Sequence, residues 1–163
     1  MATATAEKVA KATDKYEVKG VTTFRGREGY GFNANLYRNG TKVALVMDQC
    51  NGGEFIFEWV DGSSKKEAAF LDEHISGKTY VFEGEKSEYN PDIFVSELVE
   101  EYEKQKEERR IKRLLKTKTV YIIRNAETGE EVSWSLKAPF CEKVKLHLEK
   151  KYGDSLVRIV NEG

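Results

Sequence analysis

The most chemically versatile stretch of the chain is Asp48-Gln49-Cys50-Asn51-Gly52-Gly53-Glu54, which connects two apolar segments. Loops of this kind often carry function, because they are exposed and a rigid scaffold positions them. The carboxylates of Asp48 and Glu54 are of the type that serves as a general acid or base. A turn closed by its own Asp and Asn side chains has the same composition, and we favour that interpretation. As a partner-binding surface, the loop would act through four side chains: Asp48, Gln49, Asn51 and Glu54.

Cysteine and histidine are the other side chains that support nucleophilic or metal chemistry, and each occurs twice. A nucleophilic pair would need Cys50 to lie beside His74 or His147 in the fold, which the sequence does not determine. Cys141 and His147 are six residues apart, so a helix directs them to different sides. No Cys-x-x-Cys or His-Glu-x-x-His spacing is present, and we assign no metal ligand, no cofactor and no catalytic residue. Free cysteines are more often buried apolar groups, so we favour a protein without enzymatic activity.

The segment Gly26-Arg27-Glu28-Gly29-Tyr30-Gly31 has the composition of a phosphate-binding loop but not its spacing. Its pattern is G-x-x-G-x-G, no Lys-Ser or Lys-Thr pair follows, and the next residues alternate like a strand. Phosphate-binding loops lead into a helix, whose N-terminal amides hold the anion. We therefore interpret this segment as a flexible loop that enters a strand.

Within that segment, Gly29-Tyr30-Gly31-Phe32 resembles the core of the RNP1 motif of RNA-recognition and cold-shock domains. The aromatic rings of those families stack on bases. This sequence departs from the motif on both sides, with Glu28 in place of a basic residue and Asn33 in place of an aliphatic one. Because Tyr30 and Phe32 alternate with polar residues, we favour core packing for both rings.

A second indication of nucleic-acid binding is the basic run at residues 104–118, which holds eight Lys and Arg residues against two Glu. Such a patch can follow the phosphates of a nucleic acid. Acidic residues precede it in the same predicted helix, an order that the helix dipole favours, so we prefer a solvated helix face. The nucleic-acid alternative would use the aromatic residues Tyr30, Phe32 and Tyr37 together with the basic residues Arg109, Arg110, Lys112 and Arg113.

Alternating apolar residues and turn signals predict an antiparallel β-meander over about residues 17–60. Asn39-Gly40 supplies the positive φ angles of a tight hairpin turn, and Asn51-Gly52-Gly53 makes a further turn. A short helix with a serine cap follows the break at residues 61–64. A short strand is expected at residues 79–82.

A long helix is predicted from about Asp92 to Lys116, because Asn90-Pro91 marks its start and apolar residues form a stripe at both ends. The middle of this helix is almost wholly charged. The last part of the chain predicts a small β-β-α-β unit, in which Pro139 stands where the helix can begin. We therefore predict an α+β fold. Its parts are a flexible tail at residues 1–16, an antiparallel sheet domain with one helix at 17–91, a long charged helix at 92–117, and the β-β-α-β unit at 118–163.

The bulk composition excludes several classes of partner. The net charge is −1, from 27 Lys and Arg against 28 Asp and Glu, which gives no whole-molecule attraction to nucleic acid or anionic lipid. Two cysteines are too few for a disulfide scaffold. Residues 1–15 lack the apolar block of a signal peptide, and no apolar run approaches membrane-spanning length. We therefore expect a cytoplasmic protein without a membrane partner.

The hairpin Gly29–Ala44, followed by Asn51-Gly52-Gly53-Glu54 and by Trp59, resembles small uncharacterised proteins of tailed bacteriophages and of some bacteria. No activity is assigned to that group, so the resemblance implies no residue roles. It implies a phage-encoded protein in the cytoplasm of the host cell. Small phage proteins without enzyme motifs often bind host proteins, which is an argument by analogy.

Our leading hypothesis is a non-enzymatic binding module that acts on a host protein, in host takeover or in the inhibition of host defence. The predicted helix at 92–116 suits partner binding or self-association into a homo-oligomer, because it combines apolar ends with a charged middle. Its predicted partner-binding residues are Arg109, Arg110, Lys112 and Arg113. One alternative is an RNA- or single-stranded-DNA-binding protein that uses Tyr30, Phe32 and residues 104–118. Another alternative is a small-molecule-binding protein with an apolar pocket between sheet and helix.

Overall fold

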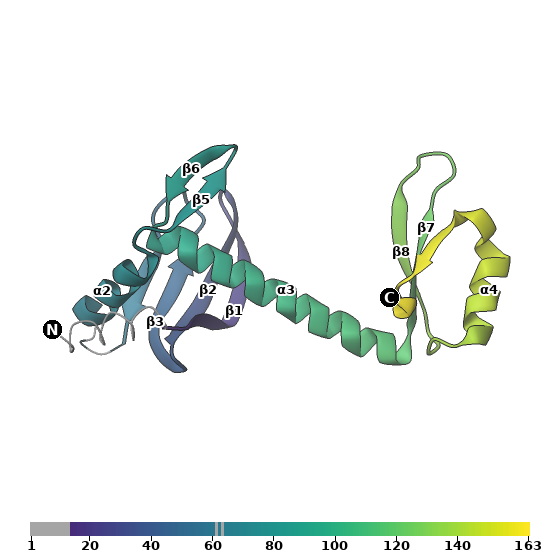
Figure 1. The fold of residues 1–163 in the computed structure, drawn as a ribbon, viewed down its shortest axis with the longest axis horizontal. Helices are drawn as coiled ribbons and strands as arrows, with labels where there is room; N and C mark the ends of the chain where they lie inside the picture. The colour runs from purple at the N-terminus through teal and green to yellow at the C-terminus, as the bar shows by residue number, and fades with distance from the viewer. Residues whose placement is uncertain (1–13, 61, 63) are drawn as a thin grey trace. The chain divides into compact units, whose positions relative to one another are not determined.

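The computed structural model describes residues 14–60, 62 and 64–163, which form a mixed α+β protein (Figure 1). The chain divides into two compact units, of which the first ends at Lys104 and the second runs from Gln105 to Gly163. The boundary lies within helix α3, Pro91–Thr117. The predicted α+β class is confirmed. Most of the predicted tail, residues 1–13, lies outside the described residues, and Tyr16 already belongs to the first strand.

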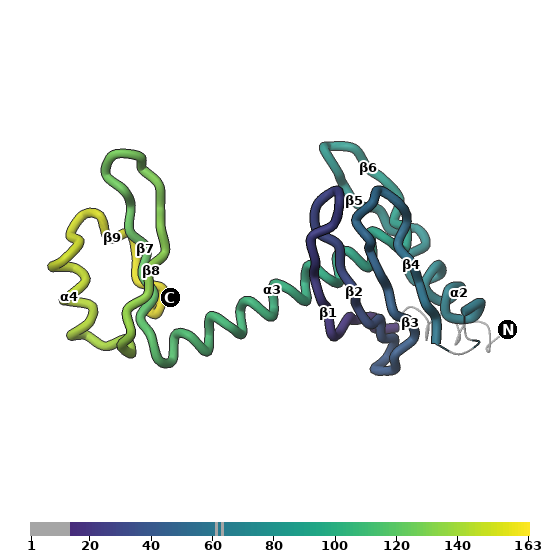
Figure 2. The backbone as a smooth tube through the Cα atoms, turned by 180° about the vertical axis from the view of Figure 1, so that it is seen from behind, coloured from purple at the N-terminus to yellow at the C-terminus, as the bar shows by residue number. Residues whose placement is uncertain are grey.

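The first unit contains a four-stranded antiparallel sheet in the order β1-β2-β3-β4, which can be followed in Figure 2. Each strand pairs with the next one along the chain, so the predicted meander is confirmed. The turn between β2 and β3 is Asn39-Gly40, with φ angles of 51° and 81°. Such angles match the right-handed twist of the flanking strands. The strands are β1 (Tyr16–Gly26), β2 (Gly29–Arg38), β3 (Thr41–Asp48) and β4 (Ile56–Trp59).

One face of this sheet carries the core of the first unit. Side chains alternate along β2, so Phe32, Ala34 and Leu36 share a face, and all three are buried. Helix α2 (Ser64–Ile75) and the first turns of α3 cover that face (Figure 1). The residues that the two helices contribute to the buried core are Leu71, Ile75, Val95 and Val99.

A second hairpin connects α2 to α3. The strand predicted at residues 79–82 is present as β5 (Thr79–Phe82), and it pairs with β6 (Glu85–Glu88). Glu83 and Gly84 form the turn, with φ angles of 50° and 85°. The sequence pattern does not predict β6, because Glu-Lys-Ser-Glu contains no β-branched or aromatic residue.

Helix α3 extends one residue beyond the predicted range at each end. Oδ1 of Asn90 accepts a hydrogen bond from the backbone N–H of Ile93 at 2.9 Å, so Asn90 caps the helix. Pro91 occupies the first helical position, where a missing N–H costs nothing. The Asn90-Pro91 boundary is therefore explained by local chemistry alone.

The second unit is a three-stranded antiparallel sheet in the order β8-β7-β9, and helix α4 packs against it. The predicted β-β-α-β order is confirmed. Its small core is built around Tyr121 from the central strand, Leu148 from the helix and Ile159 from the last strand. The elements are β7 (Thr119–Arg124), β8 (Glu131–Leu136), α4 (Glu142–Tyr152) and β9 (Leu156–Ile159).

Helix α4 begins at Glu142 and not at Pro139, where the sequence suggested a start. The residue before Pro139 is held at β7, because the hydroxyl of Thr119 donates to the carbonyl of Ala138 at 2.9 Å. The expectation for Pro139 rested on its missing N–H, which makes a helix start cheap but does not require one.

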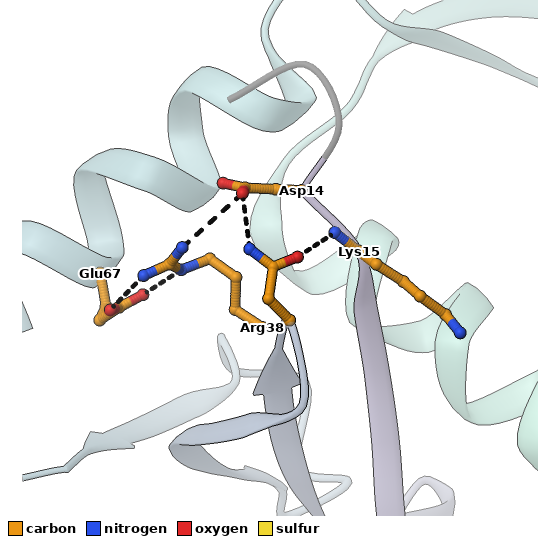
Figure 3. Close-up of polar contacts among 5 residues, drawn as sticks. Asp14, Lys15, Arg38 and Glu67 are labelled. Atoms are coloured by element: carbon orange, nitrogen blue, oxygen red, sulfur yellow. Dashed lines mark hydrogen bonds and ion pairs between the residues drawn. The ribbon is translucent and has the colours of Figure 1, made fainter. Parts of the chain in front are cut away.

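A bidentate ion pair joins the sheet of the first unit to α2 (Figure 3). Arg38, the last residue of β2, donates from Nε to Oε2 of Glu67 at 2.8 Å and from Nη2 to Oε1 at 2.9 Å. The guanidinium also lies over the ring of Phe70, 4.6 Å from its centroid, and 3.7 Å from the carboxylate of Asp14. Glu67 is buried, and its hydrogen bond is the main reason that the pKa of Arg38 is raised. The charge of Glu67 is thus compensated inside the fold.

Replacement of Arg38 by Met is expected to lower the free energy of unfolding of the first unit by roughly 2–3 kcal/mol, because Glu67 would remain buried without its partner. Urea unfolding measures this change. The chain has two tryptophans, Trp59 and Trp134, so the Trp134→Phe background lets Trp59 fluorescence report on the first unit alone. A double variant that also replaces Glu67 by Leu should regain most of the loss.

The matched control is Glu17→Gln, which breaks a solvent-accessible ion pair with Lys19 at 3.4 Å in the same unit. Exposed pairs contribute little, because water screens them. An Arg38→Met protein as stable as the Glu17→Gln protein would contradict the structural role of the buried pair.

The stability of the first unit should also depend on the protonation of His74. Its ring lies 4.8 Å from that of Tyr16 and 5.4 Å from that of Phe94, measured between centroids. Partial burial lowers the pKa of His74, and the nearby ammonium of Lys78 lowers it further. The unfolded chain, with an ordinary pKa of about 6.5, therefore binds a proton more readily than the folded chain. The stabilisation is complete above that pH and is lost as the pH falls through the lower pKa of the folded state.

We expect the unfolding free energy of the wild type to fall more steeply than that of His74→Gln between about pH 7 and about pH 5. Urea unfolding at a series of pH values measures both slopes. Equal slopes would show that His74 titrates alike in the folded and unfolded chains.

Candidate binding site

The glycine-rich segment and the loop at residues 48–54, separate in the sequence, lie against each other in the structure. The backbone N–H of Glu28 donates to the carbonyl of Cys50 at 3.1 Å. A Cβ atom on Gly26 would lie 2.6 Å from Cβ of Cys50, and one on Gly31 would overlap the carbonyl oxygen of Asp48. The glycines therefore allow two backbone segments to approach closely. The strand expected after the loop is present as β2, and residues 26–29 form the tight hairpin turn that leads into it.

The loop at residues 48–54 is a turn closed by its own side chains. Oδ1 of Asp48 accepts from the backbone N–H of Cys50 at 2.8 Å, and Oδ1 of Asn51 accepts from that of Gly53 at 3.1 Å. Cys50 has a φ of 51°, a left-handed conformation that the turn requires. The favoured interpretation as an Asx turn is confirmed. Of the predicted contact residues, Asp48 and Asn51 are engaged in holding the loop, whereas Gln49 is exposed.

A cavity of about 350 Å³ opens where this loop leads into β4. One wall is the core-facing side of β4 and the residue before it, and the other is formed by α2 and the start of α3. Its volume is at the lower end of the range for ligand pockets. The residues that line it are Glu54, Phe55, Phe57, Trp59, Ala68, Leu71, Asp72, Asn90, Pro91 and Asp92.

Aromatic rings form the sheet side of the cavity. The rings of Phe57 and Trp59 are stacked, with centroids 5.4 Å apart and planes 18° apart. Phe55 meets the buried ring of Phe32 edge to face, with centroids 5.2 Å apart. This packing fixes the base of the aromatic wall. Stacked rings present a flat face of negative potential, which attracts cations.

Three carboxylates surround the same cavity. Glu54 and Asp72 are exposed, and Asp92 is half-buried at the first turn of α3. Oδ2 of Asp92 accepts from the backbone N–H of Phe55 at 3.0 Å, which ties the helix start to the end of the loop. None of the described residues that line the cavity is Lys, Arg or His. The cavity is therefore both aromatic and negatively charged.

A second hollow of about 330 Å³ adjoins the cavity, with which it shares Asp72, Asn90 and Pro91. It is more polar, and Lys78 and Glu88 are among its lining residues. Within the described part of the chain, no group of three or more His, Cys, Asp or Glu side chains is arranged to hold a metal ion. The carboxylates of this region are thus spread along a surface and do not converge on one point.

The structure separates the aromatic residues proposed for nucleic-acid stacking. Phe32 is buried in the core, so its ring cannot stack on a base. Tyr30 is 76% exposed, which contradicts its expected place in the core. The ring of Tyr37 lies under the ammonium of Lys19, 4.7 Å from the ring centroid. The three rings therefore do not form the continuous exposed aromatic face that the resemblance to RNP1 would require.

The basic residues of α3 are exposed, as a solvated helix face requires. Arg110 pairs with Glu107, and Nη2 of Arg109 donates to Oε1 of Gln105 at 3.4 Å. Lys112 and Arg113 are exposed on the same part of the helix. All four belong to the second unit, whereas Tyr30 and the cavity belong to the first.

The proposed cysteine–histidine pairs find no support in the described contacts. His74 contacts Tyr16, Phe94 and Lys78. Cys50 lies in the turn of the 48–54 loop, half-buried. Cys141 is exposed at the residue before α4, and His147 is exposed on that helix.

Glu54 is the one cavity residue that the sequence singles out as a candidate contact. Phe57 and Trp59 were assigned to a strand, but nothing in the local pattern indicated that their shared face borders a cavity. Asp72 and Asp92 come from two helices that the fold brings to the same strand. Asp92 stands in the first turn of α3, a position that helix-dipole chemistry explains equally well, and Asp72 in the last turn of α2 gives no signal of its own.

No protein-family model, curated protein or solved structure matches the chain. None of the helices in the described ranges is both long and apolar enough to cross a membrane.

Replacement of Gly31 by Ala is expected to destabilise the first unit by about 1–3 kcal/mol, because the added Cβ would meet the Asp48 carbonyl and the ring of Phe24. Urea unfolding followed by Trp59 fluorescence measures the effect. The control is Gly53→Ala in the loop at residues 48–54, where the nearest atom to the added Cβ is Oδ1 of Asn51 at 3.1 Å. Equal stability of the two variants would contradict the close contact between hairpin and loop.

Proposed function

We propose that the chain is a non-enzymatic binding module that acts on a protein partner. The observation that carries this proposal is the cavity beside β4, where aromatic rings and carboxylates meet at one edge of a rigid sheet. Aromatic residues are typical anchors of protein interfaces, since they bury a large area at low cost in conformational entropy. The surrounding carboxylates supply the selectivity for charge.

The loop at residues 48–54 supports the same proposal. It is held by its own hydrogen bonds and by the β1–β2 hairpin, and Glu54 at its end borders the cavity. A surface that is ordered before binding loses little conformational freedom when a partner arrives. Glu54 is therefore available at the cavity, and the exposed side chains of Gln49 and Tyr30 are accessible as further contacts.

The partner that we propose is a host protein of a bacteriophage-infected cell, bound in host takeover or in the inhibition of host defence. This part of the proposal is supported by the resemblance of Gly29–Ala44 and the following Gly-Gly turn to small proteins of tailed bacteriophages. It remains an argument by analogy, whereas the cavity is an argument from geometry.

A pull-down of the tagged chain from bacterial lysate tests the proposal, with bound proteins identified by mass spectrometry. We expect one protein at a stoichiometric level that persists after nuclease treatment and at high salt. Asp72→Lys reverses a charge at the cavity and should remove that protein. Glu58→Lys is the matched control, because it makes the same charge change on the exposed side chain next to Trp59, on the opposite face of β4.

Nucleic acid in the eluate, released by salt, would instead favour the alternative in which the exposed basic residues of α3 bind phosphates. In that case, replacement of the four residues Arg109, Arg110, Lys112 and Arg113 by Gln should reduce the affinity for single-stranded RNA by orders of magnitude, and Asp72→Lys should not. That combination would overturn the protein-binding proposal. An unchanged protein partner with Asp72→Lys would move the interface away from the cavity.

A further inference from the structure

β4 is the last strand of its sheet, and among the described residues no strand pairs with its side away from β3, which we call the free edge. The hydrogen bonds of an antiparallel strand point alternately to its two sides. The backbone N–H of Val60 donates to the carbonyl of Val43 at 3.0 Å, so the backbone groups of Val60 point toward β3. Glu58 and Ile56, which are two and four residues earlier, direct their backbone groups to the same side. The backbone N–H and C=O groups of Phe57 and Trp59 therefore point away from β3, along the free edge.

The hydrogen bond of the Phe55 backbone N–H supports this alternation independently. Phe55 is two residues before Phe57, and its N–H points to Oδ2 of Asp92 and not to β3. The carboxylate of Asp92 thus occupies the first position of the free edge. The next two positions, at Phe57 and Trp59, have the directions that an added strand requires.

The side chains at those two positions line the cavity. In an antiparallel pair, residues directly opposite each other carry their side chains on the same face. A strand added to the free edge would therefore direct every second side chain toward the cavity, between the Phe57–Trp59 stack and Asp72. The hydrogen bonds along the edge would form with a segment of any sequence, whereas the cavity would select the side chain.

The lining of the cavity favours a basic side chain. A Lys ammonium or an Arg guanidinium is attracted by the faces of Trp and Phe rings, and a carboxylate accepts its hydrogen bonds. Glu54, Asp72 and Asp92 provide carboxylates around the cavity, and the described lining residues include no base that would compete. An acidic side chain, or the phosphates of a nucleic acid, would meet like charge.

We propose that the free edge of β4 binds an extended, basic segment of a partner protein as an added antiparallel strand, with a Lys or Arg side chain inserted into the cavity. This inference rests on the proposed binding function and names the class of partner segment. It also assigns distinct roles to the residues. Phe57 and Trp59 bond the backbone of the segment and face its basic side chain, and Asp72 compensates the charge.

The test uses the full chain with the substitution Trp134→Phe, which leaves Trp59 in the cavity as the only tryptophan. The probe is a capped octapeptide with alternating Arg and Thr, and the comparison peptide has Glu in place of Arg. Titration of the Arg peptide should change Trp59 emission in a saturable way. The Glu peptide should bind roughly tenfold or more weakly, which corresponds to the loss of one charge-assisted hydrogen bond.

Two peptide isomers test strand addition separately from simple charge attraction. In the proposed pairing, the Arg residues lie opposite Phe57 and Trp59, so their own N–H groups face β4. N-methylation of the Arg amides should therefore abolish binding, whereas N-methylation of the Thr amides should be tolerated. Both isomers have the same charge and composition, so a purely electrostatic contact would not distinguish them.

Protein variants complete the test. Asp72→Lys should weaken the Arg peptide roughly tenfold or more and should improve the Glu peptide, whereas Glu58→Lys should have a much smaller effect on both. Circular dichroism and the urea midpoint confirm that each variant is folded. Equal binding of the two N-methyl isomers, or equal binding of the Arg and Glu peptides, would overturn the inference.

The two proposals fail in different ways. A stoichiometric protein partner in the pull-down, combined with no response of Trp59 to the Arg peptide, would overturn the strand-addition inference and leave the binding function standing. Binding of the Arg peptide that Asp72→Lys does not change would also overturn it, because the cavity would then play no part in recognition.

Discussion

The bidentate bond between Arg38 and Glu67 is the interaction on which the architecture of the first unit depends. It connects the end of β2 to the first half of α2, across 29 residues of sequence. Ala68, Leu71 and Asp72 follow Glu67 on the same helix and form one side of the cavity. Together with the buried side chains of Leu71 and Ile75, the pair holds α2 against the sheet, where the helix forms one wall of the cavity. The buried ion pair therefore helps to position the cavity, where the carboxylate of Asp72 remains accessible.

The cavity shows how packing and recognition share the same residues. Phe55 completes the core by meeting Phe32, and its backbone N–H holds Asp92 at the start of α3. Phe57 and Trp59 contact the core with one part of each ring and border the cavity with another. Such double use makes the site rigid, because its walls cannot move without disturbing the core. A rigid, partly aromatic wall loses little entropy on binding.

The sequence predicts the parts of this fold that depend on neighbouring residues. Asn39-Gly40 favours a hairpin, Asn90-Pro91 favours a helix boundary, and the alternation from Phe32 to Leu36 identifies a buried face. The strand β6 escapes prediction because its four residues carry no strand preference and are paired only through the turn at Glu83-Gly84. Tyr30 continues the alternation of Phe32, yet it lies beside the turn between β1 and β2 and is exposed.

The candidate site was predictable only in part, for a physical reason. Glu54 stands out within an unusual loop, whereas Asp72 and Asp92 are ordinary helix residues until the fold brings them together. The partnership of Arg38 with Glu67 is equally invisible in the sequence, because it links two segments whose distance along the chain is set by other elements. Local patterns determine the elements, and long-range packing determines which side chains meet.

The unoccupied side of β4 also has a consequence for the protein on its own. Open strand edges promote sheet formation between identical molecules, which leads to aggregation. Two copies that approach through this edge would bring together the same carboxylates, Glu54, Asp72 and Asp92, and would repel each other. The repulsion between these carboxylates therefore opposes aggregation of the protein through β4. This protection weakens at high salt, because the range of the electrostatic repulsion falls to about 3 Å at 1 M ionic strength.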